Sequence, residues 1–270
     1  MVWYIVASIV PLISAVLSLI LVVGLFVWDT FREGTHILIV QLLLHEILLL
    51  IPVYLFNTYI YFTQTNRTLL IDCTFIVASR YTLYTVGHWI HVCLALNRVV
   101  AIMFPHYYPL CSNKRSLIGM IVLSWCMGLI TLLPFLVSDR DGYYGLLSPA
   151  GICGLASRNT WIFSILTSLR ISVPLLLQAL LYSAVMVTLA VRRCRTPLVP
   201  LIEMRRQRRQ SGMSVVLFVS SLWYTLCFLP MPTIAAYAPE FWMGRDLLFV
   251  WICSLLLFGS AGTPEVMPYL

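Results

Sequence analysis

Two arginines of this 270-residue chain stand out as candidates for a binding site. They are Arg80 and Arg170, which lie deep within apolar segments. A charged side chain in a membrane span costs from about 3 to more than 10 kcal/mol, so it faces a cavity or a partner. A guanidinium group in a shielded cavity binds an anion and repels an amine. The alternative is that Arg80 reaches the membrane interface or forms an internal ion pair. The candidate acids for that pair are Asp72, Glu240 and Asp246.

Aromatic residues follow Arg80 along the same segment. Tyr81 is its neighbour and Tyr84 lies one helical turn further on, so both are candidates for the same site. His88 and His91 continue roughly this stripe, where histidines are more often buried core residues than ligands or switches. No His, Cys, Asp or Glu residues have the spacing of a zinc site, and the apolar segments hold no paired aspartates or serine with a base. We therefore predict neither an enzyme nor a metal or cofactor site.

The composition identifies the elements that position these residues. Hydrophobic residues make up 61% of the chain and charged residues 10%, against roughly 25% charged in soluble domains. Seven apolar stretches each reach the ~20 residues that a membrane-spanning helix needs. The sequence therefore predicts an all-α fold, with one domain of seven transmembrane helices over residues 1–270. The predicted spans lie near 3–28, 36–62, 73–103, 117–137, 161–191, 213–237 and 247–268.

The distribution of basic residues orients this bundle. With the N-terminus outside, the inner loops and helix ends hold eleven Lys and Arg residues and the outer loops hold four, as the positive-inside rule requires. The net charge of +7 is mostly this bias, so it gives no argument for a nucleic-acid partner. The sequon that begins at Asn66 then lies outside and is a candidate for glycosylation.

A third arginine, Arg98, lies 25 positions after Cys73 in one apolar segment. At ~1.5 Å per residue, a helix of that length covers roughly 37 Å, about the bilayer with part of its headgroups. One helix thus carries a cysteine at the outer face and an arginine at the inner face. Of the eight cysteines, only Cys73 and Cys153 fall on the outer side. We expect a disulfide between them that pins the loop after span four to the top of span three.

Five motifs, in order along the spans, resemble the signatures of rhodopsin-like G-protein-coupled receptors. They occur at compatible spacing, and the resemblance covers nearly the whole chain. The motifs are Asn97-Arg98-Val99 followed by Pro105, Trp125, Pro174 followed by Tyr182, Cys227-Phe228-Leu229-Pro230, and Ser260-Ala261-Gly262-Thr263-Pro264.

This resemblance implies two sites and a signalling mechanism. Ligand binding at an outward pocket shifts the bundle to a conformation in which span six swings outward at Pro230, with Phe228 as a toggle. Arg98 then contacts a heterotrimeric G protein. The implied ligand-binding residues are Arg80, Tyr81, Tyr84, Arg170 and Phe228. The implied activation and coupling residues are Asn97, Arg98, Tyr182, Pro230, Thr263 and Pro264.

The departures from the family pattern are informative. Glu46 replaces the aspartate of span two, Gly87 stands where span three usually has serine, and Thr263 replaces asparagine, which puts the family's sodium pocket in doubt. The form Asn-Arg-x-x-Ala-Ile-x-x-Pro, which begins at Asn97, resembles divergent chemosensory receptors of nematodes and other invertebrates.

We therefore expect a multi-pass plasma-membrane receptor that contacts lipid, binds a small-molecule or peptide ligand with an acidic group, and activates a G protein. The alternative is a seven-span transporter of a small solute, which would normally show internal repeats and helices broken near the midplane. No repeat relates the two halves, although Pro230-Met231-Pro232 interrupts span six. Ligand-dependent nucleotide exchange on a G protein would favour the receptor, and solute uptake by vesicles would favour the transporter.

Overall fold

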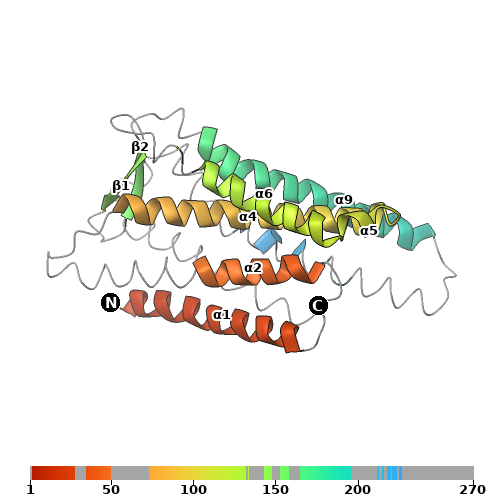
Figure 1. Cartoon of the computed structure of the whole chain (residues 1–270), viewed down its shortest axis with the longest axis horizontal. Helices are drawn as coiled ribbons and strands as arrows, with labels where there is room; N and C mark the ends of the chain where they lie inside the picture. Colours follow the sequence, from red (N-terminus) through yellow and green to blue (C-terminus); the bar gives the residue numbers. More distant parts are fainter. Residues whose placement is uncertain are drawn as a thin grey trace.

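Long helices lie side by side in the computed structural model of the chain (Figure 1). It describes residues 2–27, 35–49, 73–131, 133, 143–147, 153–157 and 165–195, together with separate positions within 212–226. The helices in these parts are α1 (Val2–Val27), α2 (Thr35–Leu49), α4 (Cys73–Met103), α5 (Tyr108–Cys111), α6 (Lys114–Ile130), the π-helix η4 (Ser168–Ser172) and α9 (Val173–Arg195).

The helix bounds can be compared with the predicted spans only where the structure describes them. The predicted span 73–103 is α4, and α1 differs from the predicted 3–28 by one residue at each end. Within the described residues, 77–103 and 165–192 form helices that are long and apolar enough to cross a membrane, and shorter apolar helices cover 15–24 and 37–49. The rest of the predicted span 36–62 beyond Leu49, and all of 247–268, lie outside the described residues.

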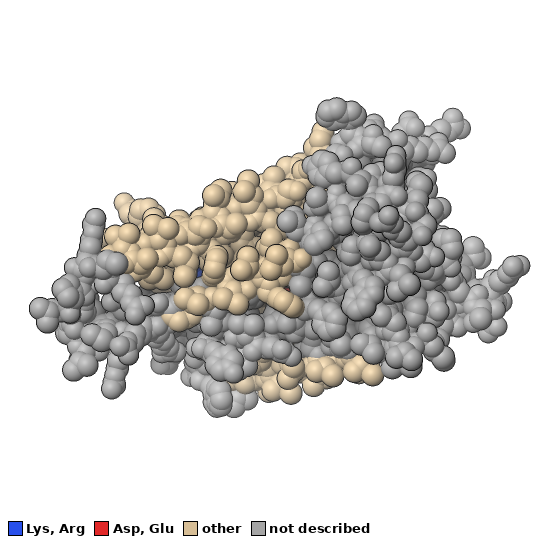
Figure 2. Space-filling view, turned by 180° about the vertical axis from the view of Figure 1, so that it is seen from behind, with Lys and Arg blue, Asp and Glu red and all other residues tan. Residues whose placement is uncertain are grey.

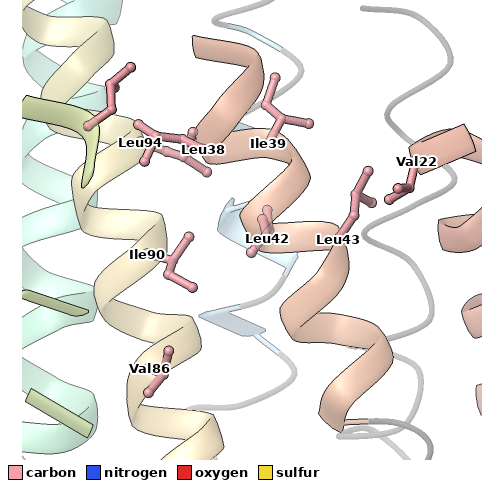
Figure 3. Close-up of a cluster of buried hydrophobic side chains, with 9 residues drawn as sticks. Val22, Leu38, Ile39, Leu42, Leu43, Val86, Ile90 and Leu94 are labelled. Atoms are coloured by element: carbon pink, nitrogen blue, oxygen red, sulfur yellow. The ribbon is translucent and has the colours of Figure 1, made fainter. Parts of the chain in front are cut away.

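Helix α4 is central among the described helices, since it contacts α2, α6 and α9. An apolar core cluster extends from α1 through α2 to α4 and α6, and Figure 3 shows side chains of this cluster pointing toward one another across the helices. Because the helices are apolar on most faces, this packing selects which residues lie inside. The cluster consists of Val22, Leu38, Ile39, Leu42, Leu43, Val86, Ile90, Leu94 and Leu117.

Two glycines allow neighbouring helices to approach α4 closely. A Cβ atom added at Gly87 of α4 would lie 2.7 Å from Cε1 of His45, so α2 packs its histidine ring directly against this backbone. A Cβ added at Gly128 of α6 would clash with Val86 and lie 3.2 Å from the carbonyl oxygen of Thr82. Small residues serve this purpose in membrane bundles, where close van der Waals contact replaces the hydrophobic effect as the main attraction.

The outer faces of the described helices are apolar, as lipid-facing surfaces must be. Ile20 of α1, Ile118 of α6 and Leu176 of α9 are all more than half exposed. In the view of Figure 2, almost none of the described surface belongs to acidic or basic residues. These faces account for the high hydrophobic fraction of the chain, because both the inside and the outside of the bundle are apolar.

A β-hairpin lies beside the end of α4 that begins at Cys73 (Figure 1). Strands β1 (Tyr143–Leu147) and β2 (Cys153–Ser157) pair antiparallel, with Leu147 opposite Cys153, and both strands contact α4. The sequence predicted a loop held against the top of this helix but predicted no strands there. The hairpin is therefore a local addition to the helical bundle, at its predicted extracellular end.

Candidate functional site

Three of the predicted ligand-binding residues meet at the ring of Tyr81. The guanidinium carbon of Arg170 lies 4.6 Å from the ring centroid, and that of Arg80 lies 5.7 Å from it. Both distances are within the range of cation–π attraction, in which the negative face of the ring attracts a cation. Tyr81 therefore joins α4 to the segment that carries Arg170. The sequence indicated each residue separately but did not show that one ring would connect the two cations.

Arg170 lies in the π-helix η4, directly before α9. Val173 donates its backbone N–H to the carbonyl of Ser168, five residues back rather than four. Proline provides the reason: Pro174 has no N–H to donate to the carbonyl of Arg170, and its ring crowds that carbonyl. The preceding turn widens, and π-turns of this kind are frequent at functional sites. This local chemistry places the Arg170 side chain inside, where it is only 3% exposed.

Tyr84 lies one turn below Arg80 on α4 and is half-buried. The next residue, Thr85, donates its hydroxyl to the carbonyl oxygen of Tyr81 at 2.9 Å, which satisfies the hydroxyl within α4 itself. The fifth predicted ligand-binding residue, Phe228, lies outside the described residues.

A layer of buried polar residues lies further along α4. His45 and Glu46 of α2 and His88 and His91 of α4 are all buried, and the three histidines lie near one another. His45 is fixed in place by a 2.7 Å hydrogen bond between its Nε2 and the carbonyl oxygen of Leu83. Within the described part of the chain, no group of His, Cys, Asp and Glu side chains could hold a metal ion.

The predicted coupling residues gather at the opposite end of α4. Asn97 is fully buried, Arg98 is nearly so, and Tyr182 of α9 lies against the same region. Arg98 lies close enough to Tyr182 that its charge would influence this hydroxyl. The ring of Tyr182 also packs edge-to-face on Phe218, with centroids 6.3 Å apart and an interplanar angle of 68°. Phe218 lies in the predicted sixth span and was not among the predicted residues, because no signature motif contains it.

Some of the predicted site residues lie outside the part of the chain that the structure describes. Pro230, Thr263 and Pro264 of the predicted activation set, and the sequon residue Asn66, lie outside the described residues. Cys73 is the first residue of α4 and Cys153 is the first residue of β2. Helix α4 and strand β2 contact each other. The bond between the two cysteines stays a prediction.

The described helices thus form an apolar bundle that carries half-buried Arg80 toward one end of α4 and buried Arg98 toward the other. The family of the protein follows from comparison with known proteins. A model described as 7 transmembrane receptor (rhodopsin family) matches residues 18–247. This is most of the chain, which therefore belongs to the rhodopsin family of seven-transmembrane receptors. Among curated proteins, no individual sequence matches the chain.

Family membership confirms the predicted fold class and the resemblance to rhodopsin-like receptors. The protein is thus a membrane protein with the seven-transmembrane receptor fold, and members of its family are signalling receptors that have ligands and G proteins as partners. The narrower resemblance to invertebrate chemosensory receptors stays a prediction.

Proposed function

We propose that this protein is a chemosensory receptor of the plasma membrane that binds an extracellular ligand and activates a heterotrimeric G protein. The observation that carries the proposal is the pair of polar sites on α4. Its outward half holds Arg80 and Tyr81, which meet Arg170 of η4, and its inward end holds Asn97 and buried Arg98. A single continuous helix therefore connects a candidate ligand site with a candidate coupling site. The Asn-Arg form of the motif supports the chemosensory assignment.

The mechanism follows from the burial of Arg98. A G protein can contact this guanidinium only after the inward end of the bundle opens, and a ligand drives that opening if it binds the open state more tightly. The rings of Tyr182 and Phe218 are in contact and connect α9 to the predicted sixth span. Opening of the bundle would break this contact. We assign the hinge to Pro230, the toggle to Phe228, and a role in activation to Thr263 and Pro264, on the strength of the family motifs.

At the extracellular end, the proposal includes the Cys73–Cys153 disulfide and a glycan at Asn66. The contact of the β1–β2 hairpin with α4 supports the disulfide, because both cysteines begin elements that meet there. The bridge would hold the hairpin against the outer end of α4 and so restrict how a ligand reaches the proposed site.

The proposal is tested by measuring guanine-nucleotide exchange on purified G proteins, both basal and in the presence of a small-molecule library, with the full chain in lipid nanodiscs. Arg98→Ala should abolish exchange while leaving ligand binding largely intact. The matched control is Arg115→Ala, which removes an exposed arginine of α6 near the same membrane face and should retain most exchange. Normal exchange by Arg98→Ala would overturn the coupling assignment. Ligand uptake by vesicles without exchange would instead favour a transporter.

A further inference from the structure

We propose that Gln178 of α9 favours the open conformation of the receptor, because water that enters on opening supplies hydrogen bonds that its buried amide does not make with the described residues. Gln178 is a signal-transmitting residue in this proposal, and it belongs to none of the family motifs and to neither of the two sites on α4. The inference rests on the proposed function, because it concerns the same opening that exposes Arg98.

The first observation is that the amide of Gln178 is buried without hydrogen bonds. The side chain is fully buried, and among the described residues neither its Nε2 nor its Oε1 atom has a hydrogen-bond partner. An amide of this kind can donate two hydrogen bonds and accept two. Because water satisfies these groups when they are exposed, a conformation that buries both of them unsatisfied is raised in free energy.

The second observation is the pattern of α9, in which an apolar residue would fit at this position. Leu175, Gln178, Tyr182 and Val185 are all buried and follow one another at three- and four-residue spacing, so they form one stripe of the helix. Tyr182 and Val185 pack against buried side chains of α4. A leucine at position 178 would continue the stripe without an unsatisfied amide. The closed conformation is therefore less stable with glutamine than it would be with leucine.

The third observation is that Gln178 lies between the two ends of the bundle that signalling connects. It is eight residues inward of Arg170 and four residues outward of Tyr182. The ring of Tyr182 contacts that of Phe218, and opening would break this contact. One helical turn, about 6 Å along the axis, separates Tyr182 from Gln178. Water that enters past Tyr182 from the inward end therefore reaches the amide of Gln178 next on this stripe.

Hydration of the amide affects only the open conformation, and this makes it a bias on the equilibrium. A hydrogen bond to ordered water is nearly as favourable as one between protein groups. An equilibrium responds to the difference in free energy between its states, so a group that is unsatisfied when closed and hydrated when open shifts the population toward opening. Gln178 thus lowers the ligand-binding energy that is needed to expose Arg98.

The test compares Gln178→Leu and Gln178→Met with the natural residue, in the full chain in lipid nanodiscs. Trifluoromethyl-phenylalanine encoded in place of exposed Val215, in the predicted sixth span, reports the closed and open fractions by fluorine NMR. The midpoint of thermal unfolding and guanine-nucleotide exchange are measured on the same variants. We expect both substitutions to raise the midpoint and to lower the open fraction and the basal exchange at least threefold. A lower midpoint would show that the amide is satisfied in the closed bundle, and an unchanged open fraction would show that its environment is equivalent in both states. Either result would overturn the proposal.

Two polar variants identify water as the partner of the amide. Water adapts to polar groups of different length and charge, so Gln178→Asn should keep most of the open fraction. Gln178→Glu should increase it, since burying a charge costs more than burying an amide. If both variants lower the open fraction as far as Gln178→Leu does, a fixed protein group matched to glutamine is the partner, which would overturn the proposal. The matched control is Gln41→Leu, which removes the amide of a half-buried glutamine of α2 and should leave the open fraction unchanged.

The two proposals can fail separately, because the fluorine signal does not depend on a G protein. A lower open fraction in Gln178→Leu, with no nucleotide exchange by any variant, would overturn the proposed coupling and support the role of Gln178. Ligand-driven exchange, with the same open fraction in Gln178→Leu and the natural chain, would overturn the role of Gln178 and support the receptor function. A single fluorine state in every variant, with and without ligand, would show that the bundle does not open and would overturn the role of Gln178.

Discussion

At the scale of single residues, the contact between Gly87 and His45 explains one departure from the family pattern, the glycine at position 87. The sequence showed a glycine where serine is usual, without a reason for it. The reason is steric, since the imidazole ring of His45 occupies the space that a side chain at position 87 would need. The hydrogen bond from His45 Nε2 to the Leu83 carbonyl holds the ring there. Neither residue alone predicts the contact, because it depends on how α2 and α4 are aligned.

This contact predicts that Gly87→Ala destabilises the receptor. The added Cβ would lie 2.7 Å from His45 Cε1, and overpacking of a tight core costs about 1–3 kcal/mol. Gly87→Ser should be at least as costly, although serine is the family's usual residue. Thermal unfolding in detergent measures the effect. The control is Gly119→Ala on α6, where nothing lies within 4 Å and the change should be neutral or mildly stabilising.

A second-site variant makes this prediction specific. In the double variant Gly87→Ala with His45→Ala, the ring that causes the clash is absent, so the double change should cost less than the sum of the two single changes. Additive costs would show that the two residues do not interact and would contradict the steric explanation.

At the scale of elements, hydropathy predicted helices well and local distortions poorly. The bounds of α1 and α4 followed from apolar length alone, because a span of lipid fixes how many residues a helix needs. The π-helix at Ser168–Ser172 could not be predicted this way, since Pro174 is compatible with a kink, a π-turn or a break. The β1–β2 hairpin was missed because its strands lie in a loop and depend on contact with α4.

The predicted Cys73–Cys153 disulfide belongs to this scale, because it would fix β2 to α4. A disulfide typically contributes 2–4 kcal/mol. Cys73→Ser and Cys153→Ser should each lower surface expression, and the double variant should be no worse than either single one. Cys111→Ser, which alters a half-buried cysteine of the short helix α5, should express normally. Free thiols at both positions in folded receptor, detected by mass spectrometry, would show that no bridge forms.

At the scale of the whole molecule, the two sites differ in how fully the sequence predicted them. Arg98 and Tyr182 were predicted from motifs, and both are buried, with Arg98 close enough to Tyr182 to influence it electrostatically. Arg80 and Arg170 were indicated only by the cost of burying charge, and Tyr81 as their common contact emerged from the fold. Phe218 carries no sequence signal, since one phenylalanine among thirteen in an apolar chain is distinguished only by what it packs against.

The contact between Phe218 and Tyr182 predicts that its loss raises basal signalling. An aromatic pair of this geometry contributes about 0.5–1.5 kcal/mol, and every 1.4 kcal/mol changes an equilibrium tenfold. If the closed state depends on the pair, Phe218→Ala should raise the open population, and with it nucleotide exchange without ligand, by roughly 2- to 10-fold. Val219→Ala, at the exposed neighbouring position, should leave basal exchange unchanged. Phe218→Ala combined with Arg98→Ala should show no exchange, because opening then exposes no arginine. Unchanged or lower basal exchange by folded Phe218→Ala would mean that this contact does not hold the bundle closed.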